Sequence, residues 1–194
     1  MLKTLFKKKN YYSDSELNNT AQGTSMADMA AELLIAPTAL MKLTLAQARM
    51  VVRYMQPQIV AQGTAFIREG DARDTGFMML LIDGEVTVET QVASRAEPIL
   101  LAVLGRGSLI GELSMLDGQP RYASCIAATP LRCAILTRES LQRLIQENPV
   151  IGAKLMLAIA LRIALQLRDN TDKLKMYAQL TQAMQEELGS RVEA

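Results

Sequence analysis

The sequence contains no histidine and no tryptophan, and only two cysteines in 194 residues. Without histidine the chain has no Ser-His or Cys-His catalytic pair, no imidazole acid or base and no histidine ligand for a metal. Cys125 and Cys133 are too few for a disulfide framework or a zinc site. Both fall in apolar runs, which is typical of small buried residues in a reducing compartment. We therefore expect no catalytic residues, no metal site, no cofactor and a cytoplasmic location.

An excess of charge of either sign is also missing. The chain has 21 lysines and arginines against 20 acidic residues, a net charge of +1. This balance indicates neither a nucleic-acid-binding surface nor an acidic tail. No apolar run approaches the roughly 18 residues needed to span a bilayer, so we expect no membrane span. The length suffices for one well-buried domain with an additional tail or helix.

The first 55 residues divide into a tail and a helical segment. Residues 1–25 are polar and lack periodicity, which predicts a flexible tail. In residues 26–55 apolar side chains recur at helical spacing, and Pro37 interrupts them. We expect two short helices there, with a break near Ala36.

Residues 56–137 consist of short β-like runs separated by glycines. The expected strands are Gln58–Val60, Thr64–Arg68, Phe77–Ile82, Glu85–Gln91, Ile99–Leu104, Tyr122–Ala128 and Leu131–Leu136. Many short strands at this spacing favour a closed roll or a sandwich. The fold class is therefore mainly β with flanking helices (α+β), an antiparallel β-roll or jelly roll.

Helical spacing returns in residues 138–190. Thr137 is the expected N-cap of a helix over Arg138–Gln146, and a long helix should begin at Pro149 and run to about Leu188. Apolar positions recur in a heptad pattern along this second helix: Ala160, Leu167, Leu174, Thr181 and Leu188, with Ile163, Asn170, Tyr177 and Met184 interleaved. A long helix with such a stripe needs a partner in water, so we expect a homodimer; packing onto its own domain is the alternative.

Residues 107–125 carry the chemistry. A glycine-bracketed loop leads into a short helix over Gly111–Leu116, followed by a turn at Asp117-Gly118 and by Arg121 beside a strand. Backbone N–H groups at a helix start, together with a guanidinium, can bind an anion. A carboxylate such as Glu112 would repel a phosphate but can accept from a sugar hydroxyl. The pair fits a ligand with a phosphate and a ribose.

These residues also carry a resemblance. Gly111-Glu112-Leu113, followed by Pro120-Arg121-x-Ala123-Ser124, resembles the phosphate-binding cassette of the cyclic-nucleotide-binding domain family, which includes the catabolite activator protein and the regulatory subunits of protein kinase A. A preceding Gly63…Gly70-Asp71…Gly84-Glu85-Val86 pattern agrees with it, and the resemblance covers about residues 45–175.

The resemblance implies that Arg121 pairs with a cyclic phosphate and that Glu112 accepts from the ribose 2′-OH. Gly111, Leu113 and Ser124 would line the cassette. Base contacts would come from the long helix, with Asn170 and Thr171 as first candidates and Gln166 one turn earlier as the alternative.

The chain departs from the family pattern in two places. Tyr122 stands where the family usually has a small residue, so its phenol would crowd or contact the ligand. The stretch of residues 74–84 is about two residues longer than usual, which predicts a bulge or longer loop beside the pocket.

From these observations we expect a stand-alone sensor of a cyclic nucleotide, with cAMP as the first candidate, that signals through an unidentified protein and does not bind nucleic acid. Two alternatives remain. One is a dimerisation module with a degenerate pocket, which Tyr122 favours. The other is a sensor of cGMP or cyclic di-GMP.

Overall fold

The structure of the protein, a computed structural model, describes residues 25–36, 43–92, 94 and 97–192, with side chains up to residue 186. The tail expected before Ser25 and the expected break at Pro37 lie outside these residues. Two compact units divide the chain after Ala158.

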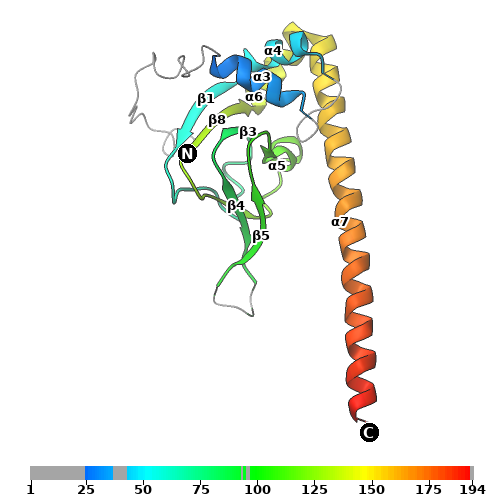
Figure 1. Ribbon diagram of the computed structural model, residues 1–194. Coiled ribbons are helices and arrows are strands. Elements are labelled where there is room, and N and C mark those ends of the chain that lie inside the picture. The colour runs from blue at the N-terminus through cyan, green and yellow to red at the C-terminus, as the bar shows by residue number, and fades with distance from the viewer. Residues whose placement is uncertain (1–24, 37–42, 93, 95–96, 193–194) are drawn as a thin grey trace. The chain divides into compact units, whose positions relative to one another are not determined.

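Two antiparallel sheets form the body of the first unit, with eight strands in the part of the chain that the structure describes. One sheet has the order β1-β8-β3-β6 and the other β2-β7-β4-β5 (Figure 1). The strands are β1 (Gln56–Val60), β2 (Ala65–Ile67), β3 (Phe77–Asp83), β4 (Val86–Thr90), β5 (Ile99–Leu104), β6 (Leu109–Ile110), β7 (Ser124–Ala127) and β8 (Leu131–Thr137). The expected antiparallel β-roll is confirmed.

The core lies between the two sheets, and β3 explains how it is closed. Alternate residues of this strand, Phe77, Met79 and Leu81, join side chains of the other sheet such as Val86 and Val88 in one apolar cluster. The intervening residues of β3 are buried as well, because α3 and α5 pack on the strand. This double coverage accounts for the uninterrupted apolar run, since a strand with one wet face would alternate.

Two short helices precede the roll, α3 (Met26–Leu34) and α4 (Leu45–Val52). Ser25 caps α3 by accepting from the N–H of Asp28. Thr44 and Gln47 form a reciprocal capping box at the start of α4, with Gln47 Oε1 accepting from the N–H of Thr44 at 3.0 Å. Local capping chemistry therefore defines where both helices begin. In Figure 1 they lie beside α6 at one end of β1 and β8.

The strand β6 was not expected from the sequence, because two residues are too few to show alternation. Leu109 and Ile110 nevertheless pair with Leu80 and Met79 of β3. The bulge expected in the longer stretch is present as a register shift between Leu81 and Asp83.

Two helices follow the roll. Thr137 caps α6 (Arg138–Glu147) as expected, since its hydroxyl accepts from the N–H of Ser140. The helix α7 (Pro149–Val192) is continuous and extends four residues beyond the expected Leu188. Between them, Asn148 donates its side-chain amide to the Tyr54 hydroxyl at 3.0 Å.

The composition of α7 bears on the expectation of no membrane span, which stays a prediction. An 18-residue window within residues 149–186 has a mean hydropathy of 1.9 with few charges, so by length and composition this helix could cross a membrane. Counting only uninterrupted apolar residues missed this, because Lys154 and Arg162 divide the run. Apolar helices that pack in a protein core pass the same test, so the composition alone does not place α7 in a membrane.

Candidate functional site

Arg121 is the centre of the site and is only 4% exposed. Its three guanidinium nitrogens all donate to backbone carbonyls. Nη1 donates to Gly111 at 2.9 Å, Nε and Nη2 donate to Asp74 at 3.2 and 2.8 Å, and Nη2 also donates to Phe77 at 3.1 Å. Because a buried cation is costly unless it is paired or hydrogen-bonded, these carbonyls make its position tenable. They join the start of α5 (Glu112–Asp117) to the loop before β3.

The ring of Phe77 and the carboxylate of Asp74 complete the surroundings of this cation. The guanidinium lies over the Phe77 ring, 4.5 Å from its centroid, where the electron-rich face attracts it. Burial lowers the pKa of Arg121 below its ordinary value, and the negative charge of Asp74 opposes the shift. Burial in turn raises the pKa of Asp74. The two shifts are those of opposite charges sharing a poorly solvated region.

Gly111 is the N-cap of α5 and has a positive φ of 86°. A Cβ built on this residue would lie 2.6 Å from Nη1 of Arg121. Glycine is therefore required at this position for two reasons: the left-handed backbone and the close approach of the guanidinium. The sequence predicted that the helix start at Gly111 and the guanidinium of Arg121 share one anion site, and the structure places the two residues in direct contact.

Glu112 and Leu113 are the first two residues of α5. Glu112 is 4% exposed and Leu113 is half-buried. A buried glutamate is uncommon unless it has polar partners, and its place at a helix start suits its charge. Glu112 directly follows Gly111, whose carbonyl accepts from Arg121, so the buried acid and the buried arginine belong to the same part of the fold.

Burial alternates at the entry to β7 and separates Tyr122 from its neighbours. Arg121 and Ala123 are buried, whereas Tyr122 is 61% exposed. Most of the Tyr122 side chain is therefore open to solvent, and its effect on a ligand stays a prediction. The hydroxyl of Ser124 accepts from the N–H of Glu69 at 3.0 Å and so binds β7 to the loop after β2.

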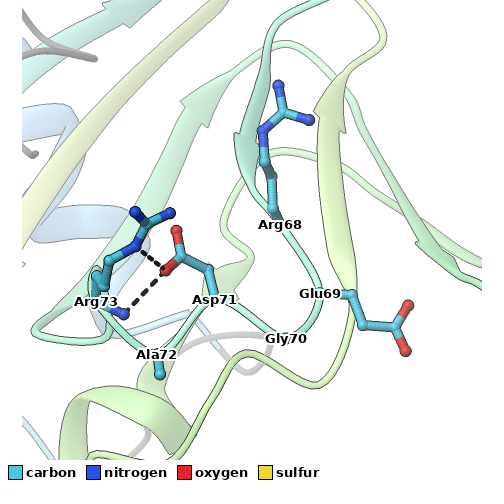
Figure 2. Close-up of a pocket in the computed structure, with 6 residues that line it drawn as sticks. All are labelled: Arg68, Glu69, Gly70, Asp71, Ala72 and Arg73. Atoms are coloured by element: carbon cyan, nitrogen blue, oxygen red, sulfur yellow. Dashed lines mark hydrogen bonds and ion pairs between the residues drawn. The ribbon is translucent and has the colours of Figure 1, made fainter.

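An open depression lies along that loop, and Figure 2 shows its lining residues: Arg68, Glu69, Gly70, Asp71, Ala72 and Arg73. Asp71 turns toward Arg73, whose backbone N–H donates to it at 2.9 Å, while Glu69 points to the other side. That hydrogen bond lowers the pKa of Asp71. The loop also bonds to the backbone of Arg121, through Gly70 N–H to its carbonyl and through its own N–H to Asp71. The depression therefore lies against the main chain of Arg121.

The three residues expected to contact a base belong to the second unit. Gln166, Asn170 and Thr171 lie on α7 beyond Ala158 and are exposed there. The Thr171 hydroxyl donates to the carbonyl of Leu167 at 2.8 Å, a local bond within the helix. Their role toward a ligand stays a prediction.

Sequence reasoning missed three residues that hold the cassette: Asp74, Phe77 and Arg138. The first two accept from Arg121 through their backbone carbonyls, and Phe77 also contacts the guanidinium with its ring. The lengthened loop was their only signal in the sequence. Arg138 has no motif of its own. It became visible only because its guanidinium donates to the carbonyls of Met115 and Ser114 at the end of α5, at 2.9 and 3.0 Å.

The two cysteines are both buried and free. Burial raises the pKa of each thiol to about 12, so neither is a nucleophile near neutral pH. Among the described residues, no group of three or more His, Cys, Asp or Glu side chains could hold a metal ion.

Comparison with known proteins identifies the class of this roll. Residues 57–148 match the family model described as "Cyclic nucleotide-binding domain". A cAMP-dependent protein kinase regulatory subunit of Yarrowia lipolytica is 35% identical over 94 residues, which are 48% of this chain and 23% of that protein. A CRP-like cAMP-activated global transcriptional regulator of Mycobacterium tuberculosis is 27% identical over 113 residues, 58% of this chain and 49% of the relative. The chain thus spans half or less of these relatives.

A solved structure agrees with this assignment. A cyclic nucleotide-binding domain from Methylobacillus flagellatus superposes with a TM-score of 0.66 and 28% identity, over 76% of this chain and 81% of that one. The chain therefore contains a domain of the cyclic nucleotide-binding family, and the recognition made from the cassette residues is confirmed.

Proposed function

We propose that this protein is a cyclic-nucleotide sensor, with cAMP as its first ligand, that binds its ligand without transforming it. The observation that carries the proposal is the contact between Arg121 and Gly111, which lies ten residues earlier in the chain. It assembles the glycine, the acid and the arginine of the cassette within one buried site. The names of the two curated relatives, both of which include cAMP, support the choice of ligand.

Phosphate binding would use an exchange of hydrogen bonds at Arg121. The guanidinium donates four hydrogen bonds to backbone carbonyls. A phosphate is a better acceptor than a carbonyl because its charge strengthens each bond, so it would take over part of this set. Carbonyls released by the exchange would need new donors, and the loop before β3 and the start of α5 would adjust together.

Glu112 would supply selectivity for a ribonucleotide. Its carboxylate can accept from a 2′-hydroxyl but would repel a second anion. Substituting glutamine keeps the size and one acceptor but weakens that bond. We expect Glu112→Gln to lower the affinity for cAMP and to leave that for 2′-deoxy-cAMP nearly unchanged.

The exposed apolar side chains of α7 support the proposal of a homodimer. Leu167, Leu174, Tyr177 and Met184, which belong to the heptad pattern, are all exposed in the single chain. A second α7 would cover them as a coiled coil does. We further propose that the protein lies in the cytoplasm, in keeping with two unpaired cysteines, and that a protein partner reads the ligand state.

The ligand experiment is isothermal titration calorimetry with cAMP, cGMP and cyclic di-GMP on the full chain. Arg121→Lys keeps the charge but loses the planar fork, and should lower affinity on the order of tenfold or more. Arg132→Lys, a half-buried arginine of β8, is the matched control and should bind like the unsubstituted chain. Unchanged binding by Arg121→Lys would refute the phosphate role. No heat with any nucleotide would favour the degenerate module.

The assembly experiment is analytical ultracentrifugation of Leu167→Asp/Leu174→Asp in the full chain. The double substitution should give monomers, while the unsubstituted chain sediments as a dimer. A chain that is recovered only with detergent would instead point to a membrane role for α7.

A further inference from the structure

Two arginines hold opposite ends of α5. Arg121 donates to the carbonyl of Gly111, which caps the start of the helix. Arg138 donates from Nε to the carbonyl of Met115 and from Nη2 to that of Ser114, the fourth and third residues of this six-residue helix. The last four carbonyls of a helix have no partner further along the same helix. The carbonyl of Ser114 also accepts from the N–H of the C-cap residue Gly118, so the guanidinium adds a second bond there and gives the carbonyl of Met115 a donor.

The same two arginines also hold the loop before β3. Arg121 donates to the carbonyl of Asp74 in this loop and to that of Phe77, the first residue of β3. The backbone N–H of Arg138 donates to the carbonyl of Gly76 at 2.8 Å. The hydrogen bonds therefore form a closed ring: Arg121, the loop, Arg138, α5 and back to Arg121. A change in the bonds of Arg121 acts on two elements, and Arg138 contacts both.

Arg138 is also the first residue of α6, and α6 is tightly joined to the start of α7. A Cβ on Gly152 of α7 would lie 2.8 Å from the Cα of Ile145 in α6, so the two helices touch backbone to backbone. Asn148, at the corner between them, donates to the Tyr54 hydroxyl, which in turn bonds to Glu147. Packed elements with such contacts move as units.

We propose that Arg138 is a positioning residue that couples the cassette helix α5 to α6 and the first turns of α7. Its role as a coupling for ligand binding rests on the proposed function, but the hydrogen-bond ring does not. When the bonds of Arg121 change, α5 and the loop shift, and Arg138 carries the shift to the α6–α7 corner, residues 145–152. A lysine would make only one of the two carbonyl bonds in a defined direction, which explains why an arginine stands here.

The first test needs no ligand. Hydrogen–deuterium exchange at residues 145–152 is compared in the full chain, in Arg121→Lys, in Arg138→Met and in the double variant. Arg121→Lys should speed exchange at the corner about fivefold or more where Arg138 is present. In the Arg138→Met background the same substitution should change the exchange rate by less than about twofold, because the guanidinium bonds to α5 are gone and only the backbone bond to Gly76 remains.

A merely structural cap would behave differently. If Arg138 only caps α5, Arg138→Met should lower the stability of the protein. Arg121→Lys should then change exchange at the corner equally in both backgrounds, and that result would overturn the proposal. No effect of Arg121→Lys at the corner in either background would overturn it too. Arg138→Lys should retain part of the coupling. It replaces Arg138→Met in the comparison if the methionine variant folds poorly. Glu139→Gln, which removes a charge from an exposed residue of the same helix, should leave the coupling intact.

The second test adds cAMP. In the unsubstituted chain the nucleotide should change exchange at residues 111–118 and at residues 145–152. In Arg138→Met only the first segment should respond. Equal responses in both chains would refute the coupling. If cAMP changes neither segment in any chain, the proposed ligand is wrong, and the ligand-free double-variant test still decides the role of Arg138.

Discussion

The cassette and the distal part of α7 depart from the usual distribution of side chains in opposite ways. In the cassette a charged pair, Arg121 and Glu112, is buried. In α7 beyond Ala158, large apolar residues such as Leu174 and Tyr177 are exposed. Buried charge requires hydrogen-bond partners, and an exposed apolar stripe requires a cover. At Arg121 backbone carbonyls meet the first requirement within the chain. A second α7 would meet the second requirement in the homodimer that we propose.

The largest expected effect is a difference in unfolding free energy between substitutions of two leucines of the same helix. Leu155 of α7 is fully buried in the first unit, while Leu174 is 67% exposed in the second. Leu155→Ala should reduce the free energy of unfolding by about 2–5 kcal/mol, because it leaves a cavity in a packed region. Leu174→Ala should leave the unfolding of the roll unchanged and weaken dimerisation instead. Urea denaturation followed at several protein concentrations separates the two effects, and an equal loss in both variants would erase the contrast.

The next largest effect on stability should separate two glycines that share a left-handed backbone conformation. Gly111 and Gly63 have φ of 86° and 77°, but a Cβ at Gly63 would meet nothing within 4 Å, whereas one at Gly111 would meet Arg121. Gly63→Ala should cost about 1–2 kcal/mol for the left-handed backbone alone. Gly111→Ala should cost about 1–3 kcal/mol more, because it also disturbs the hydrogen bonds of a buried guanidinium. Equal losses in chemical denaturation would show that the guanidinium moves aside freely.

The buried thiols of the roll should resist chemical labelling, and their raised pKa should make the stability of the fold depend on pH. At pH 8 a pKa of about 12 in place of 9.0 lowers the thiolate fraction on the order of a thousandfold, so Cys125 and Cys133 should react with a disulfide reagent only after unfolding. Between pH 9 and 12 the unfolded thiols ionise and the folded ones do not. The unfolded state then binds fewer protons, and native stability should fall as the pH rises. Fast labelling of the folded chain at pH 8 would show that the roll opens readily.

The smallest effect should be found on the wet surface of α7. The exposed pair Lys173 and Asp169 lies at an i,i+4 spacing with 2.9 Å between Nζ and Oδ2. Exposed pairs of this kind contribute little, and salt screens them. Asp169→Asn should leave the melting temperature unchanged within error, in low and in high salt. A clear loss would mean that the pair is covered in the assembled protein.

Much of the fold was predictable because its signals are local. Thr137 caps a helix through a neighbour three residues away. The glycine-separated runs matched seven of the strands that the structure describes, and β6 was missed because its two residues carry no period of their own. The cassette was recognised because its residues have fixed spacings. The exposure of Tyr122, between the buried residues Arg121 and Ala123, became clear only from the structure.

The sequence by itself determined the element types, the two-sheet class and the cassette residues Gly111, Glu112 and Arg121. Spacing, capping and glycine positions act over a few residues, so they can be read along the chain. Only the tertiary structure decided how Arg121 is held, since its carbonyl partners Asp74 and Phe77 lie 47 and 44 residues earlier. It also brought Arg138 to the end of α5 across 23 residues. Every residue has a backbone carbonyl, so these partners leave no trace in the sequence until folding brings them together.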